Sequence, residues 1–242
     1  MSINPHAKVI KPDPRKTDQV YAQIRHEIEN GTLPPGQRMS EVWLVEHTGA
    51  SRTPVRDALR RLAADELVIL EPRQAPMVTP LSLQTIRDLF EFRRVVEVAA
   101  LENISSRVSN SPEIQEQFGQ LSTKFNKLLD SSTNENFQTD FRDLTSNFDE
   151  LVSRYCNNQF LEKSISSLKP HTTRLRLIAH ADHDRLRQSI TEHIDMCNAV
   201  TAGDLRTAGA ACRQHLIHVE QSILNALITG NSPFLNSIDL RN

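Results

Sequence analysis

Residues 49–62 read Gly-Ala-Ser-Arg-Thr-Pro-Val-Arg-Asp-Ala-Leu-Arg-Arg-Leu, and this stretch decides the fold. Its apolar residues recur at i, i+3, i+4 and i+7, a spacing that predicts a helix with one buried face. The residues of that face are Val55, Ala58, Leu59 and Leu62. Ser51 is a favourable N-cap residue, and Pro54 is tolerated in the first helical turn. A helix is therefore expected to begin at Ser51.

A second face of the same helix is strongly basic. Arg52, Arg56 and Arg60 share a side that lies roughly 130° from the apolar face, at about 100° of rotation per residue. The quoted stretch holds four Arg and one Asp, whereas the whole chain has a formal net charge of −2. Arginine can bind guanine or phosphate with two hydrogen bonds, and the hydroxyls of Ser51 and Thr53 can bind phosphate at the helix N-terminus. The pattern predicts a DNA-reading helix, and an ordinary solvated charged face is the alternative.

The flanking segments predict two more helices and a hairpin. An apolar residue every fourth position marks a helix that ends at Gly31, and Ser40 caps a second, short helix. Two short apolar runs, 67–70 and 77–79, are separated by a proline-containing turn and predict a hairpin. Three helices followed by a hairpin outline a winged helix-turn-helix domain over residues 16–80.

The rest of the chain predicts helix only. Residues 81–229 are expected to form an all-α bundle with a core of its own, so the fold class is mainly α. Residues 1–15 and 230–242 have no periodic apolar face, and we expect a flexible tail and a frayed end there. The expected bundle helices run from Ser82 to about Val108, from Ser111 through Leu128, and over about 137–151, 158–168, 170–180, 186–202 and 204–228.

The composition excludes several classes of protein. The 242 residues are 38% hydrophobic and 24% charged, as is typical of a globular protein. No run approaches ~18 apolar residues and no signal peptide is visible, so we expect no membrane partner. Three cysteines without a CxxC pair favour a reduced, cytoplasmic protein. The sequence lacks the motifs of serine hydrolases, P-loop proteins and dinucleotide-binding enzymes, so we expect no enzyme.

Polar residues interrupt the apolar stripe of the first bundle helix. Arg94 and Glu97 occupy positions in a stripe that also holds Phe90 and Leu101. A buried arginine needs an anionic partner. Either Glu97 pairs with Arg94 along the helix, or Arg94 binds the carboxylate of a ligand with its planar guanidinium.

Three later helices carry candidate metal ligands. Asp143 and Asn147 lie at i, i+4 on one helix face. His193 and His215 lie among apolar positions of the last two long helices. A carboxylate with two imidazoles suits Zn²⁺, Ni²⁺ or Mn²⁺, whereas a hydrogen-bonded core histidine is the alternative at each position.

The N-terminal domain closely resembles the winged helix-turn-helix of the GntR family of transcriptional regulators. The resemblance rests on residues 31–41, Gly-Thr-Leu-Pro-Pro-Gly-Gln-Arg-Met-Ser-Glu, and on residues 49–62. The residues that it assigns to DNA reading are Ser51, Arg52, Thr53 and Arg56.

This chain departs from the family pattern at the wing. Glu66 stands where the family usually has Gly before the first wing strand, and Gln74-Ala75 replaces the usual Arg-Gly at the tip. Arg73 remains available for the minor groove or the DNA backbone. An arginine that some members place early in the second helix is replaced by Val42.

The bundle resembles the FCD effector domain, which follows the winged helix in one subgroup of this family. The resemblance is carried by Arg94-Val-Val-Glu-Val-Ala-Ala, Asp143-Leu-Thr-Ser-Asn-Phe, Thr191-Glu-His, Ala202-Gly-Asp and Arg213-Gln-His-Leu. Many such domains bind a divalent metal through Asp and three His, with a small carboxylate effector completing its shell. The resemblance implies Asp143, His193 and His215 as ligands, and effector contacts by Arg94 and Asn147. Asn147 stands where the family usually has His, and an amide oxygen binds Zn²⁺ or Ni²⁺ more weakly than imidazole.

Together, the two resemblances imply a ligand-responsive transcriptional regulator, with repression the commoner family arrangement. They imply a homodimer that binds an inverted repeat in double-stranded DNA and senses a small carboxylate. Two alternatives stay open: an architectural DNA-binding protein without an effector, and a metal-dependent phosphohydrolase. The phosphohydrolase site would use His171, His180 and the doublet His183-Asp184.

Overall fold

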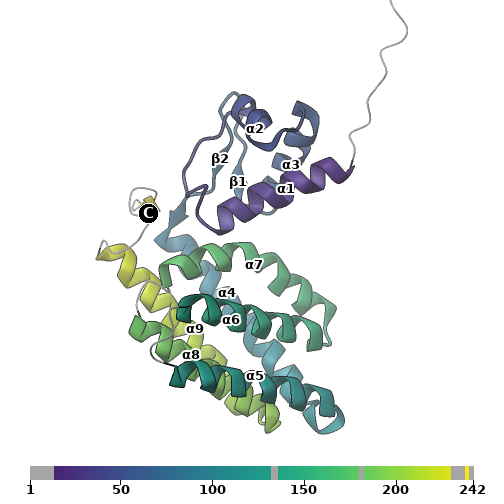
Figure 1. Ribbon diagram of the computed structural model, residues 1–242, viewed down its shortest axis with the longest axis vertical. Helices are drawn as coiled ribbons and strands as arrows, with labels where there is room; N and C mark the ends of the chain where they lie inside the picture. The colour runs from purple at the N-terminus through teal and green to yellow at the C-terminus, as the bar shows by residue number, and fades with distance from the viewer. Residues whose placement is uncertain (1–13, 132–135, 180–182, 230–237, 240–242) are drawn as a thin grey trace, which may run out of the picture. The chain divides into compact units, whose positions relative to one another are not determined.

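The computed structural model describes residues 14–131, 136–179, 183–229 and 238–239 (Figure 1). The chain divides into two compact units, Met1–Pro80 and Leu81–Asn242. Both units are mainly helical, as the sequence predicts, and the described strands are two residues long. None of the described helices is long and apolar enough to cross a lipid bilayer.

The first unit is a three-helix domain with a small hairpin. Its helices are α1 (Pro14–Glu29), α2 (Glu41–Thr48) and α3 (Arg52–Ala64). Strand β1 (Val68–Ile69) pairs antiparallel with β2 (Met77–Val78). The expected tail, residues 1–15, overlaps the start of α1 at Pro14. Proline is tolerated there because the first turn of a helix does not need its N–H as a hydrogen-bond donor. Residues 1–13 lie outside the described part.

Short-range capping fixes the turn between α2 and α3. The Ser40 hydroxyl accepts a hydrogen bond from the Trp43 N–H at 3.1 Å, which starts α2. Gly49 ends α2 with φ of 61°, a left-handed conformation that costs other residues energy. Ser51 has an extended backbone at the start of α3, and within the described chain its side chain makes no capping hydrogen bond. Its hydroxyl is therefore available at the N-terminus of this helix.

The second unit is a bundle of long helices around one core. Figure 1 shows α4 beside α9, and α5 and α8 also pack closely against each other. Buried aromatic rings, among them Phe90, Phe118, Phe125 and Phe141, fill the centre. The elements are α4 (Leu83–Ser105), the 3₁₀ turn η1 (Val108–Asn110), α5 (Pro112–Asp130), α6 (Phe137–Tyr155), α7 (Gln159–Ala179), α8 (His183–Thr201) and α9 (Leu205–Ile228).

Two expectations for this unit are wrong. The helices expected over 158–168 and 170–180 form one helix, α7, with Pro170 inside it. Apolar side chains on both sides of Pro170 pack against the same core, so burial outweighs the lost backbone hydrogen bond. In the end expected to be frayed, β4 (Ile238–Asp239) pairs parallel with β3 (Leu81–Ser82). Residues 230–237 and 240–242 lie outside the described part.

Candidate functional site

Helix α3 presents its basic face to solvent. Its apolar stripe, including Val55 and Leu59, is buried in the core of the first unit. Arg52, Arg56 and Arg60 are exposed, as are Ser51 and Thr53. The helix therefore has the two faces expected of a recognition helix, one fixed to the domain and one free for a ligand.

Two of these arginines have carboxylate partners on the surface. Arg56 binds Glu41 of α2 at 2.9 Å, and Arg60 binds Asp57 at 2.9 Å. Among the described residues, Arg52 has no ion-pair partner. Exposed ion pairs contribute only about 0–1 kcal/mol, so a DNA phosphate or base can replace these carboxylates at little cost.

Two wing residues other than glycine have a left-handed backbone. Glu66 has φ of 58° and Arg73, at the exposed tip, has φ of 64°. Arg38 donates a hydrogen bond of 3.0 Å to Gln74, which ties the wing tip to the segment before α2. The positive φ explains why Gly suits the position of Glu66.

Replacing Glu66 by Gly is expected to raise the free energy of unfolding by about 0.5–1 kcal/mol, because Gly adopts this φ without a Cβ clash. Equilibrium urea unfolding measures the change. Glu66→Ala is the matched control, since it removes the exposed carboxylate but keeps the Cβ. Equal stabilities of the two variants would contradict the strain argument.

The second unit encloses a cavity of about 420 Å³. Its inner wall combines apolar side chains with guanidinium, carboxylate and imidazole groups, which is the composition of a small-ligand site. Helices α4, α6, α7, α8 and α9 all contribute to the wall. Lining residues include Arg93, Glu97, Leu101, Phe148, Asp149, Val152, Thr172, Arg176, His193, Met196, Cys212 and His215.

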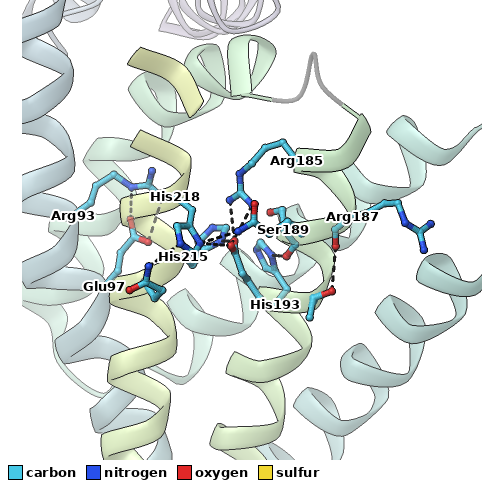
Figure 2. Close-up of polar contacts among 12 residues, drawn as sticks. Arg93, Glu97, Arg185, Arg187, Ser189, His193, His215 and His218 are labelled. Atoms are coloured by element: carbon cyan, nitrogen blue, oxygen red, sulfur yellow. Dashed lines mark hydrogen bonds and ion pairs between the residues drawn. The ribbon is translucent and has the colours of Figure 1, made fainter. Parts of the chain in front are cut away.

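Two histidines lie together on this wall, with ring centroids 4.6 Å apart (Figure 2). His193 Nδ1 lies 2.7 Å from the Ser189 carbonyl oxygen, and His215 Nδ1 lies 2.6 Å from a Glu192 carboxylate oxygen. Those oxygens only accept, so each Nδ1 carries the proton and each Nε2 of the neutral ring is an acceptor. Burial lowers the pKa of both rings, and a proton on His215 would lower the pKa of His193 further. The pair is therefore neutral near pH 7.

Glu192 is the hub that orients His215, one ring of this pair. Its carboxylate binds Arg185 at 2.8 Å, His215 at 2.6 Å and His218 at 2.6 Å. Although burial raises the pKa of Glu192, the hydrogen bonds and charges of His215 and Arg185 lower it to about 2. Glu192 is thus charged near pH 7, where it orients His215 and balances Arg185. Sequence reasoning did not identify this carboxylate.

The structure does not bring Asp143 and Asn147 to the histidines, because both side chains are exposed on α6. The α6 face toward His193 and His215 carries Thr145, which is buried and lines a small recess with both rings. Asp149, four residues on, lines the main cavity. The α6 face near the histidines is therefore offset by two residues from the expected face, which is a rotation of about 200° around the helix. The buried stripe of Phe141 and Phe148 sets this orientation.

Of the two alternatives for Arg94, the structure does not show the pairing with Glu97. Arg94 binds Glu220 of α9 at 2.5 Å and is not among the residues that line the cavity. Arg93 is buried, donates to Glu97 at 2.7 Å and lines the cavity. Spacing of i, i+4 lets these side chains meet on the inner face of α4.

The residues present do not fit the metal expected from the family. Within the described chain, no three His, Cys, Asp or Glu side chains are placed to hold one metal ion. Each carboxylate near the histidines already has a cationic partner: Glu97 has Arg93, Asp149 has Arg176 at 2.6 Å, and Glu192 has Arg185. Two neutral imidazoles beside two guanidinium groups form a poor site for a divalent cation.

The phosphohydrolase alternative finds no support in the placement of its residues. His183, at the start of α8, stacks on Phe137 with ring centroids 5.1 Å apart. His171 lies in the middle of α7. His180 lies outside the described residues.

Comparisons with known proteins match both units of the chain. Residues 16–78 match the model for bacterial regulatory proteins of the gntR family, and residues 88–218 match the FCD domain. The HTH-type transcriptional repressor RspR of Escherichia coli K12 is 24% identical over 217 residues, covering 88% of this chain and 91% of RspR. The uncharacterized HTH-type transcriptional regulator YdhC of Bacillus subtilis is 24% identical over 223 residues, 92% of this chain and 97% of YdhC.

A solved structure shares the fold. The structure of E. coli McbR/YncC superimposes with a TM-score of 0.66 at 22% identity, covering 90% of this chain and 99% of that chain. The matched families and named relatives are transcriptional regulators and not enzymes. The chain therefore belongs to the GntR family of bacterial transcriptional regulators, in which an FCD effector-binding domain follows a winged helix-turn-helix.

Proposed function

We propose that this protein is a repressor that releases its operator when a small organic acid binds the cavity of the FCD unit. The observation that carries the proposal is the cavity itself, which combines guanidinium groups with two oriented imidazoles. Arg93 contributes to the cavity from α4, the first helix after the DNA-binding unit along the chain. A ligand that binds two states of this unit differently shifts DNA affinity by a coupling energy of about 1–3 kcal/mol.

On the DNA side, Arg52 and Arg56 read the half-site. Ser51 and Thr53 bind phosphate at the helix N-terminus. Arg60 adds a flanking phosphate contact, and Arg73 contacts the minor groove or backbone from the wing. A homodimer places two such helices on an inverted repeat, since a two-fold protein matches a two-fold operator.

Selection of genomic fragments by the purified protein, at fixed physiological salt, tests this function. Salt is fixed because phosphate contacts make affinity strongly salt-dependent. A sharp inverted repeat, with affinity that falls when an organic acid is added, is the expected result. Fragments without a common motif, or affinity that no acid changes, would favour an architectural DNA-binding protein.

A further inference from the structure

Two of the three arginines that line the cavity, Arg93 and Arg176, are bound to carboxylates of the cavity wall. Arg93 of α4 is 8% exposed and binds Glu97, through Nε at 2.7 Å and Nη2 at 3.3 Å. Arg176 of α7 binds Asp149 through Nη2 at 2.6 Å. A guanidinium has five N–H donors, so each arginine keeps donors beyond those that its carboxylate takes. These donors suit a carboxylate from a ligand.

The histidine pair supplies the opposite kind of group. Both Nδ1 atoms are occupied as donors, to Ser189 and Glu192, so the Nε2 atoms of His193 and His215 are acceptors. A neutral acceptor is satisfied by a hydroxyl group of a ligand. Figure 2 shows the Arg93–Glu97 pair and the two imidazoles close together in the bundle.

The charges around the histidine pair do not favour a cation. Arg93 and Arg176 line the cavity together with both rings. Glu192, the carboxylate in contact with His215, is already bound to Arg185 at 2.8 Å. A divalent metal held by these rings would therefore lie beside guanidinium groups, and its neighbouring carboxylate would be shared with Arg185.

From this arrangement, and resting on the proposed function, we propose that the cavity binds a hydroxycarboxylate directly, without a divalent metal. The ligand carboxylate binds Arg176 and Arg93, and a ligand hydroxyl donates to an imidazole of the histidine pair. A cavity of about 420 Å³ accommodates a four- to six-carbon acid. In this chain, arginine supplies the positive charge that a bound metal would otherwise supply.

Two variants test the role of Arg176 with opposite expected signs. Arg176→Gln removes the cation and is expected to weaken binding of a hydroxycarboxylate by at least tenfold. Asp149→Asn frees Arg176 from its carboxylate partner and is expected to strengthen binding about threefold or more. Both variants lose the same ion pair, so a general effect on folding would move both affinities in the same direction. Weaker binding by Asp149→Asn would overturn the proposal, because a metal site needs that carboxylate as a ligand.

Matched probes test the ligand class. Isothermal titration of the full chain in excess EDTA compares gluconate with hexanoate, malate with succinate, and includes glucitol as a polyol without a carboxylate. At least one hydroxy acid is expected to bind at least tenfold more tightly than its deoxy partner, and glucitol is expected not to bind. The proposal is overturned if neither hydroxy acid binds, if each binds no better than its partner, or if binding requires added Mn²⁺, Ni²⁺ or Zn²⁺.

A parallel DNA-binding assay separates this inference from the proposed function. A hydroxy acid that binds in EDTA but leaves operator affinity unchanged supports the ligand class and contradicts the regulatory role. An acid without hydroxyls that alone changes operator affinity supports the regulatory role and contradicts the ligand class.

Discussion

Arg52→Ala is expected to lower affinity for the selected operator by roughly 10- to 100-fold, the loss typical of one bidentate arginine–base contact. Arg52 lies in the first turn of α3, is exposed, and is free of ion-pair partners among the described residues. Its removal therefore costs the fold little, and the loss falls on DNA binding. Fluorescence anisotropy with a labelled operator at fixed salt measures the effect, and thermal unfolding confirms an unchanged domain.

Arg61→Ala is the matched control on the same helix. Arg61 is exposed but faces α1, where it binds Asp18 at 2.5 Å and stacks over Tyr21, 4.2 Å from the ring centroid. The control variant is expected to keep operator affinity within about threefold, the scale of a peripheral charge. Equal losses for the two variants would mean that α3 attracts DNA only through net charge.

Glu192→Gln is expected to lower the free energy of unfolding by about 3 kcal/mol, since it leaves a buried cation without its counterion. Arg185 is 8% exposed and forms an ion pair with this carboxylate. The amide also presents an NH₂ group to His215 or His218, whose Nδ1 atoms both face this side chain. Urea unfolding followed by circular dichroism at pH 7.5 measures the loss.

The difference in the free energy of unfolding between wild type and Glu192→Gln depends on pH with a definite sign. The pKa of Glu192 is lowered to about 2 in the folded protein, so its stabilising effect is complete above the pKa of the unfolded chain, near 4.5. The difference between wild type and Glu192→Gln should stay constant from pH 8 to about 5.5 and shrink as pH falls from about 4.5 toward 2.

Glu220→Gln is the control for the hub, because Glu220 has one ion-pair partner, Arg94, at a half-buried site of the same unit. We expect Glu220→Gln to lower the free energy of unfolding by about 1 kcal/mol. A similar cost for Glu192→Gln would show that the converging partners add nothing to a single ion pair.

Helix α3 could be predicted because its determinants are local. The spacing of Val55 and Leu59 fixes the buried face, Gly49 fixes the turn before it, and the arginines follow from the same period. The family pattern covers the same short stretch. Nothing distant along the chain is needed to orient this helix.

The cavity depends on contacts that short-range patterns do not specify. Asp143 and Asn147 share a face, but the position of that face is set by Phe141 and Phe148, which pack against other helices. The stripe that continues through Thr145 was the available signal, since a lone threonine among buried aromatics marks a polar spot in the core. Tertiary packing decides which of two polar faces turns inward.

The charged pairs also depend on contacts between helices, which short-range patterns do not specify. Arg93 and Arg94 are adjacent, and only the packing of α4 against α9 determines which one is buried with Glu97. The Glu192 hub joins side chains from α8 and α9, and His218 lies 26 residues from Glu192 along the chain. Such convergence follows from the bundle and cannot be derived from spacing within one helix.

Pro170, in the middle of α7, affects how this helix opens locally within the bundle. It has no N–H, so the carbonyl of Ser166 has no donor at i+4, and the helix is weakest to bending at that point. Ser166 and Lys169 both line the cavity. Amide hydrogen exchange in α7 should therefore show two separate protection levels, with the halves before and after Pro170 opening as independent segments. The most easily bent part of α7 thus lies in the wall of the cavity proposed to bind the ligand.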